Sequence, residues 1–301
     1  ALPICRQLVR ADLDHLLTPP TALGPECFAH AGVVVLRQPA VRGDRYLAFD
    51  GGPFGAGHQH EDKLGFWLFA CGRNFIVDPG RHLYDWSEKS YRPYLSSTQA
   101  HSTVTVDGCG QHARGRRERW VARAPLDLEW AVGDNDVRAA AVYDEGYGED
   151  NAIDVSHRRE VVFIDNRFWV VFDRIDGTGA HALVSRFQFA PGELEQQGAG
   201  AVTTYADANL LLQAAATTAF DQVDVAVGAE HPRAGWYSDS YGRIEPAPML
   251  RFHVETDLPW AAATLLYPFA GRACPAVSLS FDGAVARVHE PDAGTTEVRP
   301  R

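Results

Sequence analysis

The sequence predicts an all-β fold dominated by a large antiparallel β-sandwich. Many short runs rich in aliphatic and aromatic residues follow one another with few helical segments between them, which is typical of a sandwich and not of a doubly wound α/β fold. Two of the connections between these runs, Asp165-Asn166 and Asp282-Gly283, are typical of hairpin turns, because Asp, Asn and Gly tolerate positive φ. A hydrophobic content of 46% in 301 residues is enough for a substantial core.

One helix is expected, near the N-terminus. Between residues 5 and 17, apolar side chains recur on one helical face, and the run Thr18-Pro19-Pro20 then ends the pattern. After Phe28 the pattern changes to β-strands. They are expected over residues 33–36, 46–49, 64–70, 103–106, 161–164, 168–172, 183–189, 210–212, 250–254, 262–266, 277–281 and 285–288.

Two stretches interrupt the strands. Residues 192–200, rich in Gly and Gln, are expected to form a long loop, and the proline-bearing stretch 245–248 is expected to mark a seam before the last strands. The chain is therefore divided into a helical linker over residues 1–27, a sandwich domain over 28–247, and C-terminal strands over 248–301. These last strands either complete the sandwich or form a small separate β unit.

Composition excludes several classes of protein. A formal net charge of -11 argues against a general nucleic-acid or anionic-membrane surface, although the arginines between residues 114 and 119 form either a local acidic-ligand site or a solvated loop. No apolar run approaches the roughly 20 residues that a membrane helix needs. Five scattered cysteines without a C-x-x-C spacing indicate neither a disulfide scaffold nor a zinc ribbon. No signal peptide is visible, and because a mature or truncated form would look the same, the compartment stays open.

The densest group of reactive side chains is Gly-His-Gln-His-Glu-Asp at residues 57–62. In an extended backbone, His58 and His60 project to the same face, where they either share a metal or divide metal binding and proton transfer between them. A solvated polar turn is the alternative. Together with Asp78 and His101, each placed beside a predicted strand, two imidazoles and a carboxylate make a reasonable tetrahedral zinc set, with water or a further ligand in the fourth position.

These segments resemble the heparinase II/III-like family of polysaccharide lyases. The most specific matching text is residues 57–66 (GHQHEDKLGF), 72–80 (GRNFIVDPG), Tyr84 and 100–108 (AHSTVTVDG). Weaker similarity at residues 31–37, 46–52, His181 and 235–242 extends the resemblance over roughly residues 28–255. The resemblance implies a sandwich that a zinc ion organises, and it favours a periplasmic or secreted protein.

By resemblance, His60, Asp78 and His101 match the zinc ligands of the family, and His58 matches the histidine beside the substrate uronate. The family's reaction is β-elimination: a base removes the C5 proton of a uronic acid, the carboxylate is neutralised, and the C4 oxygen leaves. Such a site needs a base of tuned pKa, a clamp on the carboxylate and an acid for the leaving oxygen. The implied partner is an acidic polysaccharide or oligosaccharide, such as a glycosaminoglycan or alginate.

In this family a tyrosine from an N-terminal helical toroid supplies the remaining proton chemistry. The chain resembles only the sandwich portion, so residues 1–27 are interpreted as a linker or toroid remnant, and a toroid domain or companion chain is an expected partner.

Several side chains are candidates for contact with the sugar. Tyr84, Tyr91 and Tyr94 lie between two proposed ligands and either face the site or pack at strand ends. Candidate uronate clamps are Arg73, Arg81 and Arg92, since guanidinium suits bidentate carboxylate binding, with a plain surface charge as the alternative for each.

Nearby polar residues are expected to support the ligands. Glu61 and Asp62 are expected to brace the ligand loop, because a carboxylate commonly holds the second nitrogen of a ligand imidazole. Ser102 stands where the family commonly has asparagine.

Two other functions stay open. If the toroid is truly missing, the chain is a non-catalytic sandwich that binds acidic carbohydrate. His58-Gln59-His60-Glu61-Asp62 also fits the H-x-H-x-D start of a metallo-β-lactamase-like hydrolase, but Lys63 stands where the next histidine belongs, and the strand-rich pattern fits that αββα architecture poorly.

Overall fold

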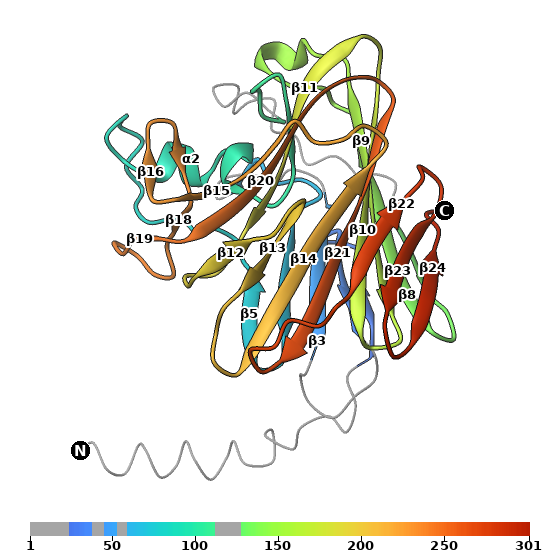
Figure 1. The fold of residues 1–301 in the computed structure, drawn as a ribbon. Coiled ribbons are helices and arrows are strands. Elements are labelled where there is room, and N and C mark those ends of the chain that lie inside the picture. The colour runs from blue at the N-terminus through green and yellow to red at the C-terminus, as the bar shows by residue number, and fades with distance from the viewer. Residues whose placement is uncertain (1–23, 38–44, 53–58, 112–127) are drawn as a thin grey trace, which may run out of the picture.

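The computed structural model describes residues 24–37, 45–52, 59–111 and 128–301. Within these ranges the chain is built almost entirely of antiparallel strands (Figure 1), which confirms the predicted fold class. The architecture is not the αββα arrangement of the hydrolase alternative. The predicted helix at residues 5–17, the arginines at 114–119 and His58 lie outside the described residues.

Three sheets make the sandwich. The five-stranded sheet has the order β1 (Glu26–Phe28), β2 (Val33–Leu36), β3 (Arg45–Asp50), β4 (Phe66–Ala70), β5 (Arg73–Ile76). The four-stranded sheet has the order β15 (Gln222–Val227), β20 (Pro248–Asp257), β11 (Ala180–Gln188), β6 (Val104–Val106). The eight-stranded sheet has the order β12 (Leu194–Gln196), β13 (Gly200–Thr203), β14 (Ala208–Ala216), β21 (Trp260–Ala270), β10 (Phe168–Asp176), β9 (Ser156–Ile164), β8 (Asp136–Tyr143), β7 (Glu129–Val132).

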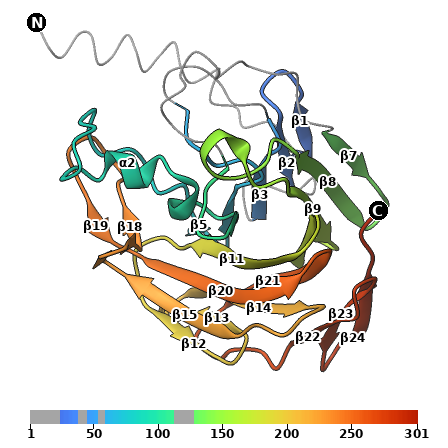
Figure 2. The ribbon, with the colours of Figure 1, turned by 90° about the horizontal axis from the view of Figure 1, so that it is seen from above.

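Smaller elements lie at the two ends of the molecule (Figures 1 and 2). At one end are α2 (Arg92–Leu95), η1 (Thr98–Ala100) and the short pairs β16 (Ala229–Glu230) with β17 (Arg233–Ala234) and β18 (Trp236–Tyr237) with β19 (Glu245–Pro246). At the other end a sheet of β22 (Ser278–Phe281), β23 (Ala286–Glu290) and β24 (Gly294–Val298) closes the chain. The 3-10 turn η3 (Glu149–Asn151) joins β8 to β9. No helix in the described ranges is long and apolar enough to cross a membrane.

Strand β10 is buried on both faces, which explains why its sequence is apolar and does not alternate between apolar and polar residues. Trp169, Val171 and Ile175 point into the large core that joins the five-, four- and eight-stranded sheets. The intervening residues Phe168 and Val170 point to the opposite face, where a second core packs against the C-terminal sheet. Because alternate side chains of a strand face opposite ways, a strand covered on both faces needs apolar residues at nearly every position.

The local turn signals predict the positions of two hairpins. Asp165 and Asn166 have φ of 48° and 53° and form a hairpin turn between β9 and β10, as predicted, although Arg167 also belongs to the turn and makes it one residue longer. The second turn spans residues 282–285 and is longer than the two residues predicted, although Gly283 does adopt a positive φ of 91°.

One loop differs from the prediction. Residues 192–200 do not form a long loop, because they contain β12, which pairs with β13 at the edge of the eight-stranded sheet. The polar composition of that strand reflects its exposed edge position. Of the strands after residue 247, β20 and β21 lie inside the four- and eight-stranded sheets, and β22 to β24 form a sheet of their own that begins at Ser278.

Candidate active site

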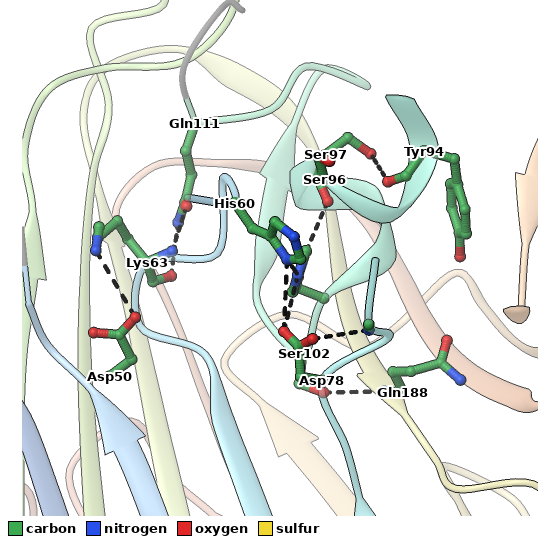
Figure 3. Close-up of polar contacts among 12 residues, drawn as sticks. Asp50, His60, Lys63, Asp78, Tyr94, Ser96, Ser97, Ser102, Gln111 and Gln188 are labelled. Atoms are coloured by element: carbon green, nitrogen blue, oxygen red, sulfur yellow. Dashed lines mark hydrogen bonds and ion pairs between the residues drawn. The ribbon is translucent and has the colours of Figure 1, made fainter. Parts of the chain in front are cut away.

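The structure brings three of the predicted side chains together, those of His60, Asp78 and His101; Figure 3 labels the first two. His60 precedes β4, Asp78 follows β5, and His101 follows η1 on the way into β6. Nδ1 of His60 lies 3.1 Å from Nε2 of His101, and Oδ2 of Asp78 lies 3.7 Å and 3.3 Å from these two nitrogens. Three chain segments therefore direct one ligand atom each to a common point.

The spacing of these atoms fits a zinc ion. With metal–ligand bonds of about 2.0–2.1 Å, a tetrahedral zinc holds its ligand atoms about 3.3–3.4 Å apart. The three observed separations, from 3.1 to 3.7 Å, lie on both sides of that value. Two imidazole nitrogens and one carboxylate oxygen are also a donor set that zinc accepts.

Hydrogen bonds behind the ligand atoms orient two of the side chains. Nδ1 of His101 donates to the carbonyl of Ser97 at 2.8 Å, which leaves the lone pair of Nε2 directed at the site. Oδ1 of Asp78 accepts the N–H of Gly80 at 2.8 Å, so Oδ2 remains for a cation. The side chain of Asp78 is 29% exposed and that of His101 only 4%, so the site opens on the Asp78 side.

One hydrogen bond of His60 opposes a metal. Its Nε2 accepts a hydrogen bond from Nη1 of Arg92 at 3.1 Å. A metal on Nδ1 would place the ring proton on Nε2, where it would face the guanidinium. Metal binding therefore requires Arg92 to turn away from this nitrogen.

A fourth acidic side chain, Asp62, lies beside the three. One of its carboxylate oxygens is within 4.8 Å of the other ligand atoms. Its Oδ1 is buried, and within the described ranges it has no hydrogen-bond partner. Since buried polar atoms are almost always paired, this oxygen favours a cation or a water in the site. A cavity of about 10 Å³ beside Asp62, Asp78 and His101 is close to the space that one water needs.

Electrostatics prepare the group for a cation. Burial alone raises the pKa of Asp78, but hydrogen bonds from His101 and His60 outweigh burial and hold the pKa of this carboxyl well below its usual range. Burial lowers the pKa of His60, so its imidazole is neutral near pH 7. At His101 the neighbouring Asp78 outweighs burial and raises the pKa, which favours a proton that a metal would have to displace. The anionic Asp78 and the neutral His60 already have the protonation states that a metal needs.

Two buried side chains tie the ligand loops to the sandwich. Nη1 of Arg159, on β9, donates to the carbonyls of Leu64 at 2.7 Å and Ser102 at 2.6 Å. Leu64 has a φ of 64°, which is rare for leucine, and this contact helps to hold it there. Gln111 binds both the N–H and the carbonyl of Lys63 at 2.8 Å (Figure 3).

A cleft of about 360 Å³ adjoins His60 and Asp78. Two chain segments line it: Gly80, Arg81, His82 and Tyr84 on one, and Ser238, Asp239, Ser240 and Tyr241 on the other.

Gly80 allows these two segments to approach each other. It forms a parallel bridge with Ser238, whose N–H donates to the carbonyl of Pro79 at 2.9 Å. A Cβ at position 80 would lie 1.9 Å from the carbonyl oxygen of Ser238, and the φ of Gly80 is +81°, so only glycine fits.

Of the three candidate tyrosines, Tyr84 lines the cleft, and its hydroxyl accepts a hydrogen bond from Arg81. The hydroxyl of Tyr91 instead donates to Glu230 at 2.6 Å. Tyr94 is buried, its hydroxyl accepts the N–H of Gly235 at 3.1 Å, and burial raises its pKa to about 12. Within the described residues, Tyr91 and Tyr94 are outside the cleft lining.

Of the three candidate arginines, Arg81 alone lines the cleft among the described residues. Arg73 pairs with Asp207 at 2.8 Å and stacks over Tyr205, at the end of β5 opposite Asp78. Arg92 is buried against His60 rather than exposed to a sugar. The second cleft segment was visible in the sequence only as part of the resemblance at residues 235–242.

The fold and the site together define the chain as an antiparallel β-sandwich with a polar cleft beside a metal-type donor set. A family model described as "Heparinase II/III-like, C-terminal" matches residues 21–298. The chain belongs to this family, as the resemblance predicted.

Known relatives agree in sequence and fold. The heparin-sulfate lyase of Pedobacter heparinus is 25% identical over 193 residues, which are 62% of this chain and 27% of that protein. The crystal structure of heparan sulfate lyase HepC from Pedobacter heparinus has a TM-score of 0.73 at 20% identity, covering 98% of this chain and 48% of that one. A crystal structure of Heparinase III has a TM-score of 0.71 at 17% identity, covering 93% of this chain and 43% of that one. The chain therefore spans less than half of the length of these relatives.

Proposed function

We propose that the chain is the sandwich portion of a polysaccharide lyase that cleaves uronic-acid-containing glycans by β-elimination, with one zinc on His60, Asp78 and His101. The observation that carries this proposal is the convergence of three ligand atoms, 3.1 to 3.7 Å apart, at the edge of a polar cleft. Membership of a heparinase-like family supports the same reaction.

The cleft residues divide the chemistry between them. Arg81 neutralises the uronate carboxylate, because a guanidinium pairs with a carboxylate through two parallel hydrogen bonds. Neutralisation lowers the cost of the negative charge that develops when the C5 proton leaves. His58, which its match to the family motif places beside the uronate, accepts the C5 proton, and the hydroxyl of Tyr84 donates a proton to the C4 oxygen as the C4–O bond breaks. Bound zinc supplies positive charge and joins the three ligand loops.

The substrate and partner follow from the relatives. Proteins named as heparin-sulfate and heparan sulfate lyases point to a glycosaminoglycan as the substrate, with alginate as the alternative uronate polymer. Because the chain spans less than half of those proteins, we infer that a helical toroid, on the same polypeptide or on a companion chain, completes the cleft.

The experiment is an ultraviolet assay for the new C4=C5 double bond. The sandwich together with its toroid portion is incubated with heparan sulfate, chondroitin sulfate and alginate. We expect absorbance to rise with at least one of them, and His58→Ala to abolish the rise while zinc content stays unchanged. Full activity in His58→Ala, or no unsaturated product from any uronate polymer, would overturn the proposal.

A non-catalytic carbohydrate-binding sandwich is the second candidate, favoured by the partial coverage of the relatives. It predicts saturable binding of an acidic glycan with no unsaturated product, even when the toroid portion is present.

A further inference from the structure

Two exposed tyrosines face each other at the cleft. Tyr241 is 72% exposed and Tyr84 is 53% exposed, and their ring centroids are 6.1 Å apart with an interplanar angle of 39°. Both residues line the cleft beside His60 and Asp78. Large aromatic side chains are normally at least half buried, so two exposed rings at one cleft indicate a binding surface.

The backbone under Tyr241 is fixed rather than free. The N–H of Gly242 donates to the carbonyl of His82 at 3.0 Å, and the N–H of His82 donates to Oγ of Ser238 at 2.9 Å. Oγ of Ser238 donates in turn to the carbonyl of Ser240 at 3.1 Å. The segment that carries Tyr241 is thus attached to the segment that carries Tyr84, so the two rings are positioned before any ligand arrives. Preorganised rings lose little conformational entropy on binding.

Arg81 places a cation beside the rings, with which an acidic ligand can pair. The guanidinium of Arg81 lies 4.8 Å from the ring centroid of Tyr84, within the cleft. The neighbouring carboxylate of Asp239 is paired with Arg243 at 2.9 Å, which offsets its negative charge. The cleft therefore offers aromatic faces beside a cation.

We propose that Tyr241 is a specificity-determining residue, whose ring stacks against the sugar next to the one that is cleaved. A pyranose presents a face of C–H groups that packs on an aromatic ring, while its hydroxyl and acidic groups reach polar neighbours such as Arg81 and Ser240. The proposal rests on the proposed lyase function, because it takes the reacting sugar to lie over His60 and Asp78. It predicts that affinity grows when the glycan is long enough to reach Tyr241.

The test measures binding by titration calorimetry with heparan sulfate disaccharides and tetrasaccharides. The protein is the complete enzyme carrying His58→Ala, so that the probes stay intact. We expect the His58→Ala enzyme to bind the tetrasaccharide more tightly than the disaccharide. Adding Tyr241→Ala to this enzyme should remove most of that difference and weaken tetrasaccharide binding about tenfold. Tyr241→Phe keeps the ring and should stay within about twofold. Trp130→Ala, at an exposed aromatic of β7 outside the cleft lining, is the matched control and should change neither affinity.

The outcomes separate the two proposals. If Tyr241→Ala binds the tetrasaccharide as tightly as its parent, or if Tyr241→Phe loses as much affinity as Tyr241→Ala, the stacking role is refuted. In the active enzyme, Tyr241→Ala should raise KM and leave kcat nearly unchanged, because stacking binds substrate and transition state alike. Unchanged KM with intact cleavage refutes the stacking role and leaves the lyase standing. Loss of binding in an enzyme that forms no unsaturated product supports the stacking role and refutes the lyase.

Discussion

Arg159 and Asp173 are direct cross-strand partners on β9 and β10 and form a fully buried ion pair, with Nε–Oδ1 at 2.7 Å and Nη2–Oδ2 at 3.0 Å. The remaining Nη1 of Arg159 donates to the carbonyls of Leu64, four residues after His60, and of Ser102, directly after His101. The centre of the eight-stranded sheet thus fixes the relative position of the two histidine loops.

Replacing Arg159 by Met should therefore destabilise the protein strongly. The change leaves Asp173 buried without its main counter-charge, and breaking a buried pair in this way costs about 3–5 kcal/mol. Urea denaturation measures the change in the free energy of unfolding. Arg174→Met is the matched control, since Arg174 is exposed on the neighbouring strand β10 and should change that free energy by less than about 0.5 kcal/mol. Equal effects of the two substitutions would contradict the anchoring role.

Gly80→Ala should separate the two cleft segments. The new Cβ would meet the carbonyl oxygen of Ser238 at 1.9 Å, in addition to the strain of a φ of +81°. Gly72 has the same φ of +81° with no atom within 4 Å, so Gly72→Ala isolates the strain, worth about 1 kcal/mol. We expect Gly80→Ala to lower the free energy of unfolding by about 1–3 kcal/mol more than Gly72→Ala. Thermal denaturation of both variants tests this, and equal losses would show that the close approach is not rigid.

His157 predicts a pH dependence of stability. Burial lowers its pKa, although Asp173 partly opposes the shift, and within the described ranges its Nδ1 has no hydrogen-bond partner. The folded state therefore binds fewer protons at this site than the unfolded state, whose pKa is about 6.5. Stability from this group is full above pH 6.5 and declines as pH falls below that value. Denaturation curves between pH 7.5 and pH 5 should show this decline in the wild type and a smaller one in His157→Gln. A steeper decline in His157→Gln would refute the assignment.

Local turns and the segments that resemble the family could be predicted from the sequence, but the pairing of distant strands could not. The turn at Asp165-Asn166 was predictable because two adjacent residues determine its backbone. The proximity of His60, Asp78 and His101 was predictable because the segments that resemble the family carry all three residues. Burial of Arg159 and the contact of Tyr94 with Gly235, 141 residues away, depend on which strands pair, and no spacing in the sequence gives that.

The same limit applies to charged and polar residues near the site. Arg73, Arg81 and Arg92 look alike in the sequence, yet one lines the cleft, one is buried against a histidine, and one pairs with Asp207. From the sequence, Asp62 was expected to brace the loop. Its position beside the other three side chains, with an Oδ1 that has no hydrogen-bond partner in the described ranges, follows from the folding of distant segments.

The central claim is that His60, Asp78 and His101 hold one zinc beside the cleft. Anomalous diffraction on either side of the zinc absorption edge, from crystals of protein purified without added metal, tests it most directly. The account predicts one anomalous peak within bonding distance of Nδ1 of His60, Oδ2 of Asp78 and Nε2 of His101, and its loss in His101→Ala. A wild-type crystal grown with zinc that shows no peak there, or a peak that His101→Ala leaves unchanged, would contradict the claim.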